Sequence, residues 1–188
     1  MTSGTSSDAI EGGAQDYILR PAFLSDAAEL AKLGRESFCA SFEHLYAAED
    51  LSAFLESAYT PQVVEQEIAD DRYIHKLADE EGALLGYCKM SDPSGYIEYS
   101  DAVKPIALNQ LYTAPGMTGR GIGARLMGWA IAEAKQRGCD AIQLSVWSEN
   151  FGAQRFYERY GFKKIADIDF WVGSHRDDEF LFEKRLGD

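Results

Sequence analysis

The chain has 188 residues, of which 46% are hydrophobic and 26% charged, and its formal net charge at pH 7 is -13. This length and composition are ordinary for one globular domain that buries its own core. The acidic balance excludes nucleic acid as an expected partner, because binding a phosphate backbone requires a basic face. Such a charge would attract a cationic small molecule, although it is also common in proteins whose acidic surface only keeps them in solution.

No hydrophobic run approaches membrane-spanning length, so we expect no membrane partner. Residues 1–15 lack the basic start and apolar segment of a secretory signal, and we expect a disordered tail before a domain over residues 16–188. Cys39, Cys88 and Cys139 are far apart and share no metal-ligand spacing with the histidines. These features predict a cytoplasmic protein with reduced thiols and no bound metal.

The N-terminal half shows the pattern of a strand, a helical region and a hairpin. Pro61 is expected to divide the helical region, because proline cannot continue a helix. The expected elements are a strand at 17–20, a helix from Ser25 or Asp26 through Phe38, helices within 46–70, and strands at 73–78 and 83–90 around the turn DEEG.

The C-terminal half begins with a loop at 91–105, whose proline, glycine and polar residues suggest a place near the substrate. The elements expected after it are a strand at 106–113, a helix at 121–137, a strand at 141–147, a helix from Asn150 to Gly161, and strands at 162–171 and 178–185. The helix at 121–137 carries its inner stripe at every fourth residue from Ile122. This order of strands and helices predicts an α/β layer fold with a mixed sheet.

Three glycines alternate in the stretch TGRGIGARLM at residues 118–127. A glycine-rich loop that runs into a helix N-terminus is typical of a phosphate-binding site, because the backbone can approach the anion closely. A nucleotide-binding P-loop requires Lys and Ser or Thr after its last glycine, whereas Ala124 and Arg125 follow Gly123 here. A dinucleotide fingerprint has a different glycine spacing and follows an early strand. Neither of these two classes of site therefore fits well.

The stretches LYTAPGMTGRGIGARLM and VWSENFGAQRFYERYGF together resemble the GNAT superfamily of acyl-CoA N-acyltransferases. In that family's pyrophosphate motif, Gln/Arg-x-x-Gly-x-Gly/Ala, Gly121 and Gly123 match the last two positions and Thr118 stands at the first. The second stretch matches the family's segment at Asn150, Ala153, Phe156, Tyr157, Gly161 and Phe162. The resemblance spans residues 17–186 and implies a mixed, mostly antiparallel sheet that is splayed at the cofactor site, with helices on both faces.

The resemblance implies direct transfer of an acetyl group from acetyl-CoA, the co-substrate, to a primary amine. Tyr157 would protonate the leaving thiolate, the Leu111 N–H would stabilise the oxyanion, and Asn150 would hydrogen-bond the cofactor arm. The strand end at Leu111, Tyr112 and Thr113 would pair with the same arm. The backbone of the glycine loop would bind the pyrophosphate through Gly119, Arg120, Gly121, Ile122, Gly123 and Ala124, and the Arg120 and Arg125 side chains would add screening.

The sequence does not identify the amine acceptor or the general base. Residues 38–70 resemble the helical region of bacterial spermidine/spermine acetyltransferases, which favours a polyamine acceptor, and many acidic residues lie between 36 and 81. The alternative acceptors are an amino acid, an aminoglycoside or a protein N-terminus. The alternative function is a non-catalytic acyl-CoA-binding regulatory module. We expect the protein to be a monomer or a homodimer. Asn109 stands where such relatives carry Glu. The carboxylate candidates for the base are Glu36, Glu98 and Glu149, and a chain of water molecules is the alternative. Phe42, Tyr99 and Trp147 are candidates for lining the acceptor site.

Overall fold

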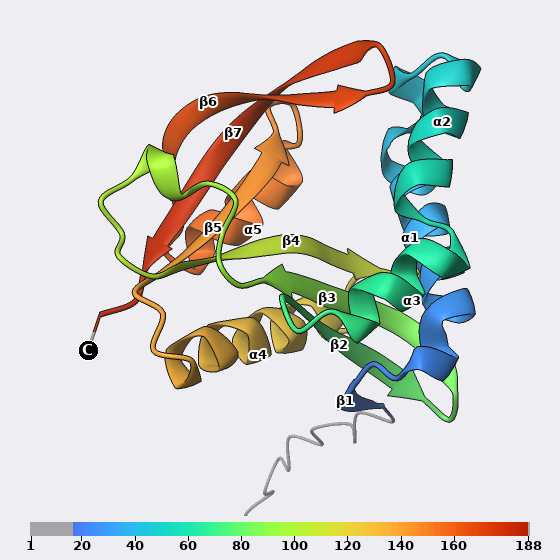
Figure 1. Cartoon of the computed structure of the whole chain (residues 1–188), viewed down its shortest axis with the longest axis horizontal. Coiled ribbons are helices and arrows are strands. Elements are labelled where there is room, and N and C mark those ends of the chain that lie inside the picture. The colour runs from blue at the N-terminus through green and yellow to red at the C-terminus, as the bar shows by residue number, and fades with distance from the viewer. Residues whose placement is uncertain (1–16, 188) are drawn as a thin grey trace, which may run out of the picture.

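The computed structural model describes residues 17–187, so the tail expected at residues 1–15 lies outside the described residues. Within that range seven strands form one sheet in the order β1-β2-β3-β4-β5-β7-β6 (Figure 1). Neighbouring strands are antiparallel except β4 and β5, which are parallel, so the expected mixed sheet is confirmed. The strands are Ile18–Pro21 (β1), Tyr73–Glu80 (β2), Ala83–Ser91 (β3), Pro105–Thr113 (β4), Ala141–Trp147 (β5), Lys163–Val172 (β6) and His175–Arg185 (β7).

Helices cover both faces of the sheet, as expected (Figure 1). On one face α4 and α5 pack against β3, β4 and β5. On the other face α1 and α3 pack against β2 and β3, and α2 joins α1 and β6 in a third apolar cluster. Within residues 17–187 the α-helices are Ala27–Phe42 (α1), Ala48–Ala58 (α2), Pro61–Ala69 (α3), Ile122–Gln136 (α4) and Phe151–Arg159 (α5).

The amphipathic pattern of α4 determines which side of this helix meets the sheet. Ile122, Leu126, Ala130 and Ala134 are each at most 1% exposed. Residues four apart lie on one face of a helix, so the four side chains form a continuous stripe against the strands. Gly138 follows the helix with a φ of 69°, a conformation that ends helices and favours glycine. The stripe and the stop expected from the sequence are both confirmed.

Two boundaries show how local chemistry sets the ends of elements. Pro61 is the first residue of α3, and Thr60 caps that helix by accepting a hydrogen bond from Val63 N at 3.3 Å. The break expected at Pro61 is confirmed, because proline at this position has no N–H to leave unpaired. The turn between β2 and β3 consists only of Glu81 and Gly82, with φ of 52° and 93°. Two positive φ values suit a tight two-residue hairpin, so both strands run further than expected.

The strands β4 and β5 pair only at their first three residues and then separate. The paired positions are Pro105 with Ala141, Ile106 with Ile142, and Ala107 with Gln143. The splay expected at this place in the sheet is therefore confirmed.

A β-bulge lies where the two strands separate. On the other side of β4, Lys89 pairs with Gln110 and Met90 with Leu108, which leaves Asn109 as an extra residue. Such a bulge bends its strand and increases its twist. It also moves Leu111 onto the face of the sheet that Leu108 occupies, where both side chains join the core beneath α4.

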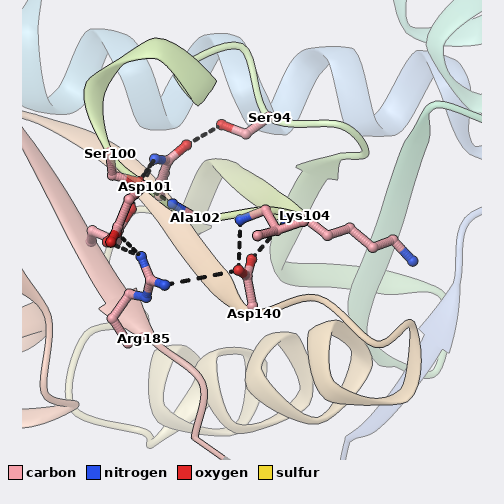
Figure 2. A network of polar contacts seen from close by, with 10 residues as sticks. Ser94, Ser100, Asp101, Ala102, Lys104, Asp140 and Arg185 are labelled. Carbon is pink, nitrogen blue, oxygen red and sulfur yellow. Dashed lines mark hydrogen bonds and ion pairs between the residues drawn. The ribbon is translucent and has the colours of Figure 1, made fainter.

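A polar network holds the loop between β3 and β4 against the closed end of the β4–β5 pair (Figure 2). The Asp140 carboxylate accepts hydrogen bonds from Val103 N at 2.6 Å and from Lys104 N at 2.9 Å. Arg185 at the end of β7 donates to Asp101 at 2.8 Å. Ser94 donates to the buried Gln143 of β5 at 2.6 Å. The loop is thus fixed at several points along its length, and it covers the polar face of β5 and β7.

Gly86 lets β3 lie close to the splayed end of β4. A Cβ at this position would lie 2.6 Å from the Tyr112 carbonyl oxygen and 3.0 Å from Ile122 Cγ2. Because a backbone oxygen cannot rotate away, we expect Gly86→Ala to lower the free energy of unfolding by about 1–3 kcal/mol.

The control for this stability prediction is Gly128→Ala, which places a Cβ on the exposed side of α4 with nothing within 4 Å. Alanine is favoured over glycine within helices, so this variant is expected to be as stable as the wild type or slightly more stable. Urea unfolding of both variants measures the difference. Equal unfolding midpoints for Gly86→Ala and the wild type would show that the close approach of Gly86 to the Tyr112 carbonyl does not affect stability.

Candidate active site

A cleft of about 680 Å³ runs from the glycine loop, through the gap between β4 and β5, to β7. Thr118 and Gly123 line one end, and the β4 residues from Leu108 to Thr113 line its length. The cleft takes side chains from both faces of the sheet, because α5 lines it from one side and α1 and α2 line it from the other. One continuous space thus connects the two faces where the strands separate.

The glycine loop presents unpaired backbone N–H groups at the start of α4. Gly119 and Gly121 have φ of 86° and 75°, and Gly121 is the N-cap residue of the helix. The first bond at this end is donated by Arg125 N to Gly121 O at 3.1 Å. Within residues 17–187 the N–H groups of Gly121 through Ala124 have no hydrogen-bond partner. Unpaired N–H groups at the positive end of a helix dipole are suited to an anion such as a diphosphate.

The two arginines of this loop bind other parts of the chain. Arg120 donates to Glu80 of β2 at 2.7 Å and lies 3.3 Å from Met117 Sδ. Arg125 donates to Tyr17 O at 3.1 Å and stacks over the Tyr17 ring at 4.5 Å. Both guanidinium groups therefore already have partners, and the anion-binding character of the loop rests on its backbone.

Tyr157 projects from α5 into the cleft. Its ring packs against Phe156 and Phe162, with centroids 5.5 Å and 5.9 Å away. Within the described part of the chain its hydroxyl has no hydrogen-bond partner. Burial raises the pKa of this phenol above its usual value of about 10, and the charge of Glu179 acts in the same direction. Tyr157 is therefore a neutral proton donor at pH 7 whose hydroxyl is available to a ligand.

Asn150 begins α5 and also lines the cleft. Its Oδ1 accepts a hydrogen bond from Ala153 N at 3.0 Å, which makes it the N-cap residue of the helix. The cap role expected from the sequence is confirmed. Because Oδ1 is occupied, only the amide NH₂ of Asn150 is left for another group in the cleft.

Two carboxylates on β7 also line the cleft. Asp177 and Glu179 are the acidic side chains among its lining residues within the described chain. Asp177 accepts a hydrogen bond from the Tyr46 hydroxyl at 2.5 Å and lies 3.2 Å from His175 Nε2. Glu179 lies beside Ser145 of β5, and its Oε2 is buried without a hydrogen-bond partner. Burial raises the pKa of the Glu179 carboxyl above its ordinary value.

Sequence reasoning missed both of these carboxylates. Asp177 lies before the expected start of the last strand at residue 178, although β7 begins at His175, and Glu179 lies within the expected strand. Asp177 and Glu179 alternate along the strand and so share one face, but only the register of β7 against β5 reveals which face. Glu179 is paired with Trp147, so the two carboxylates lie on the face that α1 covers through the contact of Phe42 with Trp147.

The carboxylates proposed from the sequence as general bases lie elsewhere. Glu36, Glu98 and Glu149 are exposed, and none of them lines the cleft. Phe42 and Trp147 do line it, with ring centroids 6.2 Å apart. Tyr99 is 41% exposed and lies outside the lining, whereas the nearby Tyr96 is part of it. The acidic residues between 36 and 81 are likewise absent from the lining.

Helix α2 contacts the hairpin of β6 and β7, and the two approach each other in Figure 1. Asp50 of α2 accepts hydrogen bonds from Ser174 N at 2.7 Å and from Ser174 Oγ at 3.2 Å. The aromatic residues that line the cleft come from several elements: Phe38, Phe42, Tyr46, Phe54, Tyr59, Tyr96, Tyr112, Trp147, Phe156, Tyr157 and Phe170. Aromatic walls around buried carboxylates suit a cation that carries an alkyl chain.

Across residues 17–187 no three His, Cys, Asp or Glu side chains are grouped closely enough to hold a metal ion. No helix in the same range is long and apolar enough to cross a membrane. Cys39, Cys88 and Cys139 are all free thiols.

Comparison with known proteins identifies the family and the fold. Residues 36–162, which contain both the glycine loop and α5, match the Acetyltransferase (GNAT) family. This chain belongs to the GNAT family. Its reaction class is that of the family, N-acetyl transfer with acetyl-CoA as co-substrate, and the expected enzyme class and co-substrate are confirmed.

Individual GNAT relatives match nearly the whole chain at low identity. An uncharacterized N-acetyltransferase of Mycobacterium tuberculosis is 28% identical over 87% of this chain and 99% of its own length. The spermidine N(1)-acetyltransferase of Thermoplasma acidophilum is 26% identical over 89% of this chain and 96% of its own length.

Solved GNAT structures share the fold. The PaiA N-acetyltransferase of Thermoplasma acidophilum in complex with coenzyme A superposes with a TM-score of 0.74 at 22% identity, over 90% of this chain and 99% of that one. The ribosomal-protein-S18-alanine N-acetyltransferase of Escherichia coli has a TM-score of 0.67 at 14% identity, over 92% and 95% of the two chains. These two acetyltransferases have the same fold as this chain.

Proposed function

We propose that this GNAT enzyme acetylates a primary amine of a small cationic molecule and that a polyamine is its preferred acceptor. The observation that carries this proposal is the pair of carboxylates, Asp177 and Glu179, that line the aromatic cleft. A carboxylate pair that is held away from bulk water attracts a cation more strongly than surface charges do.

The cofactor end of the proposed mechanism uses the backbone. The glycine-loop N–H groups from Gly119 to Ala124 bind the pyrophosphate of acetyl-CoA, and Asn150 donates to its pantetheine arm. The arm lies against the splayed strand from Leu111 to Thr113 like an added strand. In this arrangement the Leu111 N–H stabilises the oxyanion that develops on the acetyl carbonyl. The separation of β4 from β5 after Ala107 supports this part of the proposal, since it leaves that edge of β4 unpaired.

Tyr157 is the proposed general acid. It protonates the thiolate that leaves when the acetyl group is transferred. Its position in the cleft, its raised pKa and its hydroxyl without a partner among residues 17–187 support this role. A phenol with a pKa above about 10 stays protonated at pH 7 and is matched to a thiolate of similar basicity.

The polyamine preference has a different structural basis from the one expected from the sequence. The acidic residues between 36 and 81 do not line the cleft, so they are not candidates for contact with the acceptor. Asp177 and Glu179 are two residues apart on one strand, which separates their Cα atoms by about 7 Å. That spacing suits two amines joined by three or four methylene groups. The named spermidine acetyltransferase among the relatives supports the same choice.

Steady-state kinetics with spermidine and butylamine test the acceptor. We expect kcat/KM for spermidine to exceed that for butylamine about tenfold, which corresponds to about 1.4 kcal/mol from a second ion pair. Asp177→Asn should remove most of this preference and change the butylamine reaction little. Acetylation of butylamine at the same kcat/KM as spermidine would overturn the polyamine proposal and leave the acetyltransferase assignment intact.

The salt dependence of the preference for spermidine shows which carboxylates cause it. The screening length falls from about 10 Å at 0.1 M salt to about 3 Å at 1 M, and buried pairs are screened much less than exposed ones. If Asp177 and Glu179 hold the acceptor, most of the spermidine preference persists at high salt. A preference that disappears at high salt would instead indicate capture by the acidic surface.

A further inference from the structure

We propose that Glu179, whose side chain lines the cleft, is the general base that takes the proton from the attacking amine. The inference rests on the proposed function, because it concerns the same cleft and the same reaction.

Glu179 and Tyr157 approach the splay from opposite faces of the sheet. Tyr157 belongs to α5 and packs with the core beneath α4. Glu179 is paired with Trp147 of β5, on the face where Phe42 of α1 packs. Both side chains line the one cleft that passes between β4 and β5. A thioester in the splay therefore has the acid on the side of its sulfur and Glu179 on the side from which an amine enters.

Glu179 and Asp177 differ in their hydrogen-bond partners. Asp177 is already engaged by the Tyr46 hydroxyl and by His175. Ser145 lies against the Glu179 carboxylate, yet Oε2 of that carboxylate has no hydrogen-bond partner within residues 17–187. Leaving a buried acceptor unpaired costs free energy. A rotation of the Glu179 carboxylate that turns this oxygen to the cleft would pair it with an ammonium group of the acceptor.

The electrostatic surroundings favour proton uptake at Glu179. Burial raises its pKa, the contact with Ser145 opposes this shift, and the charge of Asp177 adds to it. A carboxylate whose pKa is raised is a stronger base toward an ammonium than one in water. The other titratable groups that face it are phenols with raised pKa values, from the segment after α1, the β3–β4 loop, β4 and α5: Tyr46, Tyr96, Tyr112 and Tyr157.

The proposed steps balance in atoms and charge. The Glu179 carboxylate accepts one proton from the ammonium, and the freed lone pair of nitrogen forms the bond to the acetyl carbon. The carbon–sulfur bond then breaks with its electron pair on sulfur, and Tyr157 gives its proton to that thiolate. A second proton leaves nitrogen and restores the Tyr157 phenol, while Glu179 releases its proton to water. The products are the amide, the free thiol and one proton.

The decisive measurement is the pH profile of kcat/KM for Glu179→Gln. With the base present, kcat/KM for total amine is level from neutral pH up to the pKa of the amine. Without it, only the neutral amine reacts, so log kcat/KM should rise by one for each pH unit and approach the wild-type value at high pH. At pH 7 the loss should be about 10²- to 10⁴-fold. The affinity for acetyl-CoA should be unchanged, because Glu179 is not part of the glycine loop or of α5, where the cofactor is proposed to bind.

Two further variants complete the experiment. Asp178→Asn changes the neighbouring exposed carboxylate, which pairs with Arg176 at 2.9 Å, and should keep the wild-type profile. Glu179→Asp keeps the carboxylate but withdraws it by one methylene group. It should lose less activity than Glu179→Gln and keep a level profile, and it serves as the test if the glutamine variant does not fold.

The outcomes distinguish this inference from the proposed function. If Glu179→Gln keeps the level wild-type profile and rate, Glu179 is not the base, although the enzyme still acetylates its amine. If the wild type itself transfers acetyl groups to none of the amines tested, the proposed acceptor class is wrong.

Discussion

Replacement of Tyr157 by phenylalanine is expected to lower kcat by about a hundred- to a thousandfold, within the range for loss of one general acid. The ring and its contacts with Phe156 and Phe162 remain, and only the hydroxyl is lost. The affinity for acetyl-CoA should therefore change little. Rapid measurement of thiol release at saturating amine, together with calorimetric titration of acetyl-CoA, separates the two quantities.

The pH dependence gives a second measurement of the same role. An acid must be protonated to act, so a raised pKa extends the active range of Tyr157 upward. The decline of kcat on the alkaline side should begin above about pH 10, the ordinary value for tyrosine. It should be absent from the residual activity of Tyr157→Phe.

The matched control is Tyr160→Phe, one turn further along the same apolar side. Tyr160 packs against Phe156 at 5.0 Å but does not line the cleft. This variant should turn over at the wild-type rate. A wild-type rate for Tyr157→Phe as well would show that Tyr157 only packs and that water or another group supplies the proton.

The second large effect is expected at the glycine loop, where Gly121→Glu should abolish detectable binding of acetyl-CoA. Gly121 adopts a φ of 75°, and a side chain in this left-handed region costs about 1–2 kcal/mol. A carboxylate at the start of α4 would also repel a pyrophosphate from the unpaired N–H groups there. Gly121→Ala carries the conformational cost without the charge and should lose only part of the affinity.

Gly128→Glu is the control, because it adds the same charge to the same helix at an exposed position with nothing within 4 Å of a new Cβ. Acetyl-CoA should raise the melting temperature of this variant and of the wild type by mass action. ATP and NAD should raise neither. An unchanged acetyl-CoA affinity in Gly121→Glu would contradict the assignment of the glycine loop as the pyrophosphate site.

Most of the elements could be predicted from the sequence because their signals are local. The stripe of α4, the proline at the start of α3 and the cap at Asn150 each depend on residues within one or two turns. The two family motifs are also short stretches, and together they predicted the fold class, the reaction class and the co-substrate. Propensity, capping and motif spacing operate over these distances, so tertiary structure was not needed to recognise them.

The bulge at Asn109 had no such local signal. The stretch from Ile106 to Thr113 reads as one continuous strand, and only its pairing with β3 shows the extra residue. That residue changes which side chains of β4 point to each face beyond it. It therefore determines that Leu111 and Leu108 share the core side, whereas Tyr112 packs with the cluster on the opposite face.

The sequence by itself determined that this protein is an α/β GNAT acetyltransferase, since helix periodicity and the two short motifs depend on residues that are close together in the chain. Only the tertiary structure decided which carboxylates line the cleft. Asp177 and Glu179 come from the last strand and meet β4, α5 and α1 through the register of β7 on β5. Long-range pairing of this kind depends on the packing of the whole sheet. For that reason the many acidic residues of the N-terminal half, prominent in the sequence, stay outside the cleft, and two inconspicuous ones at the other end of the chain line it.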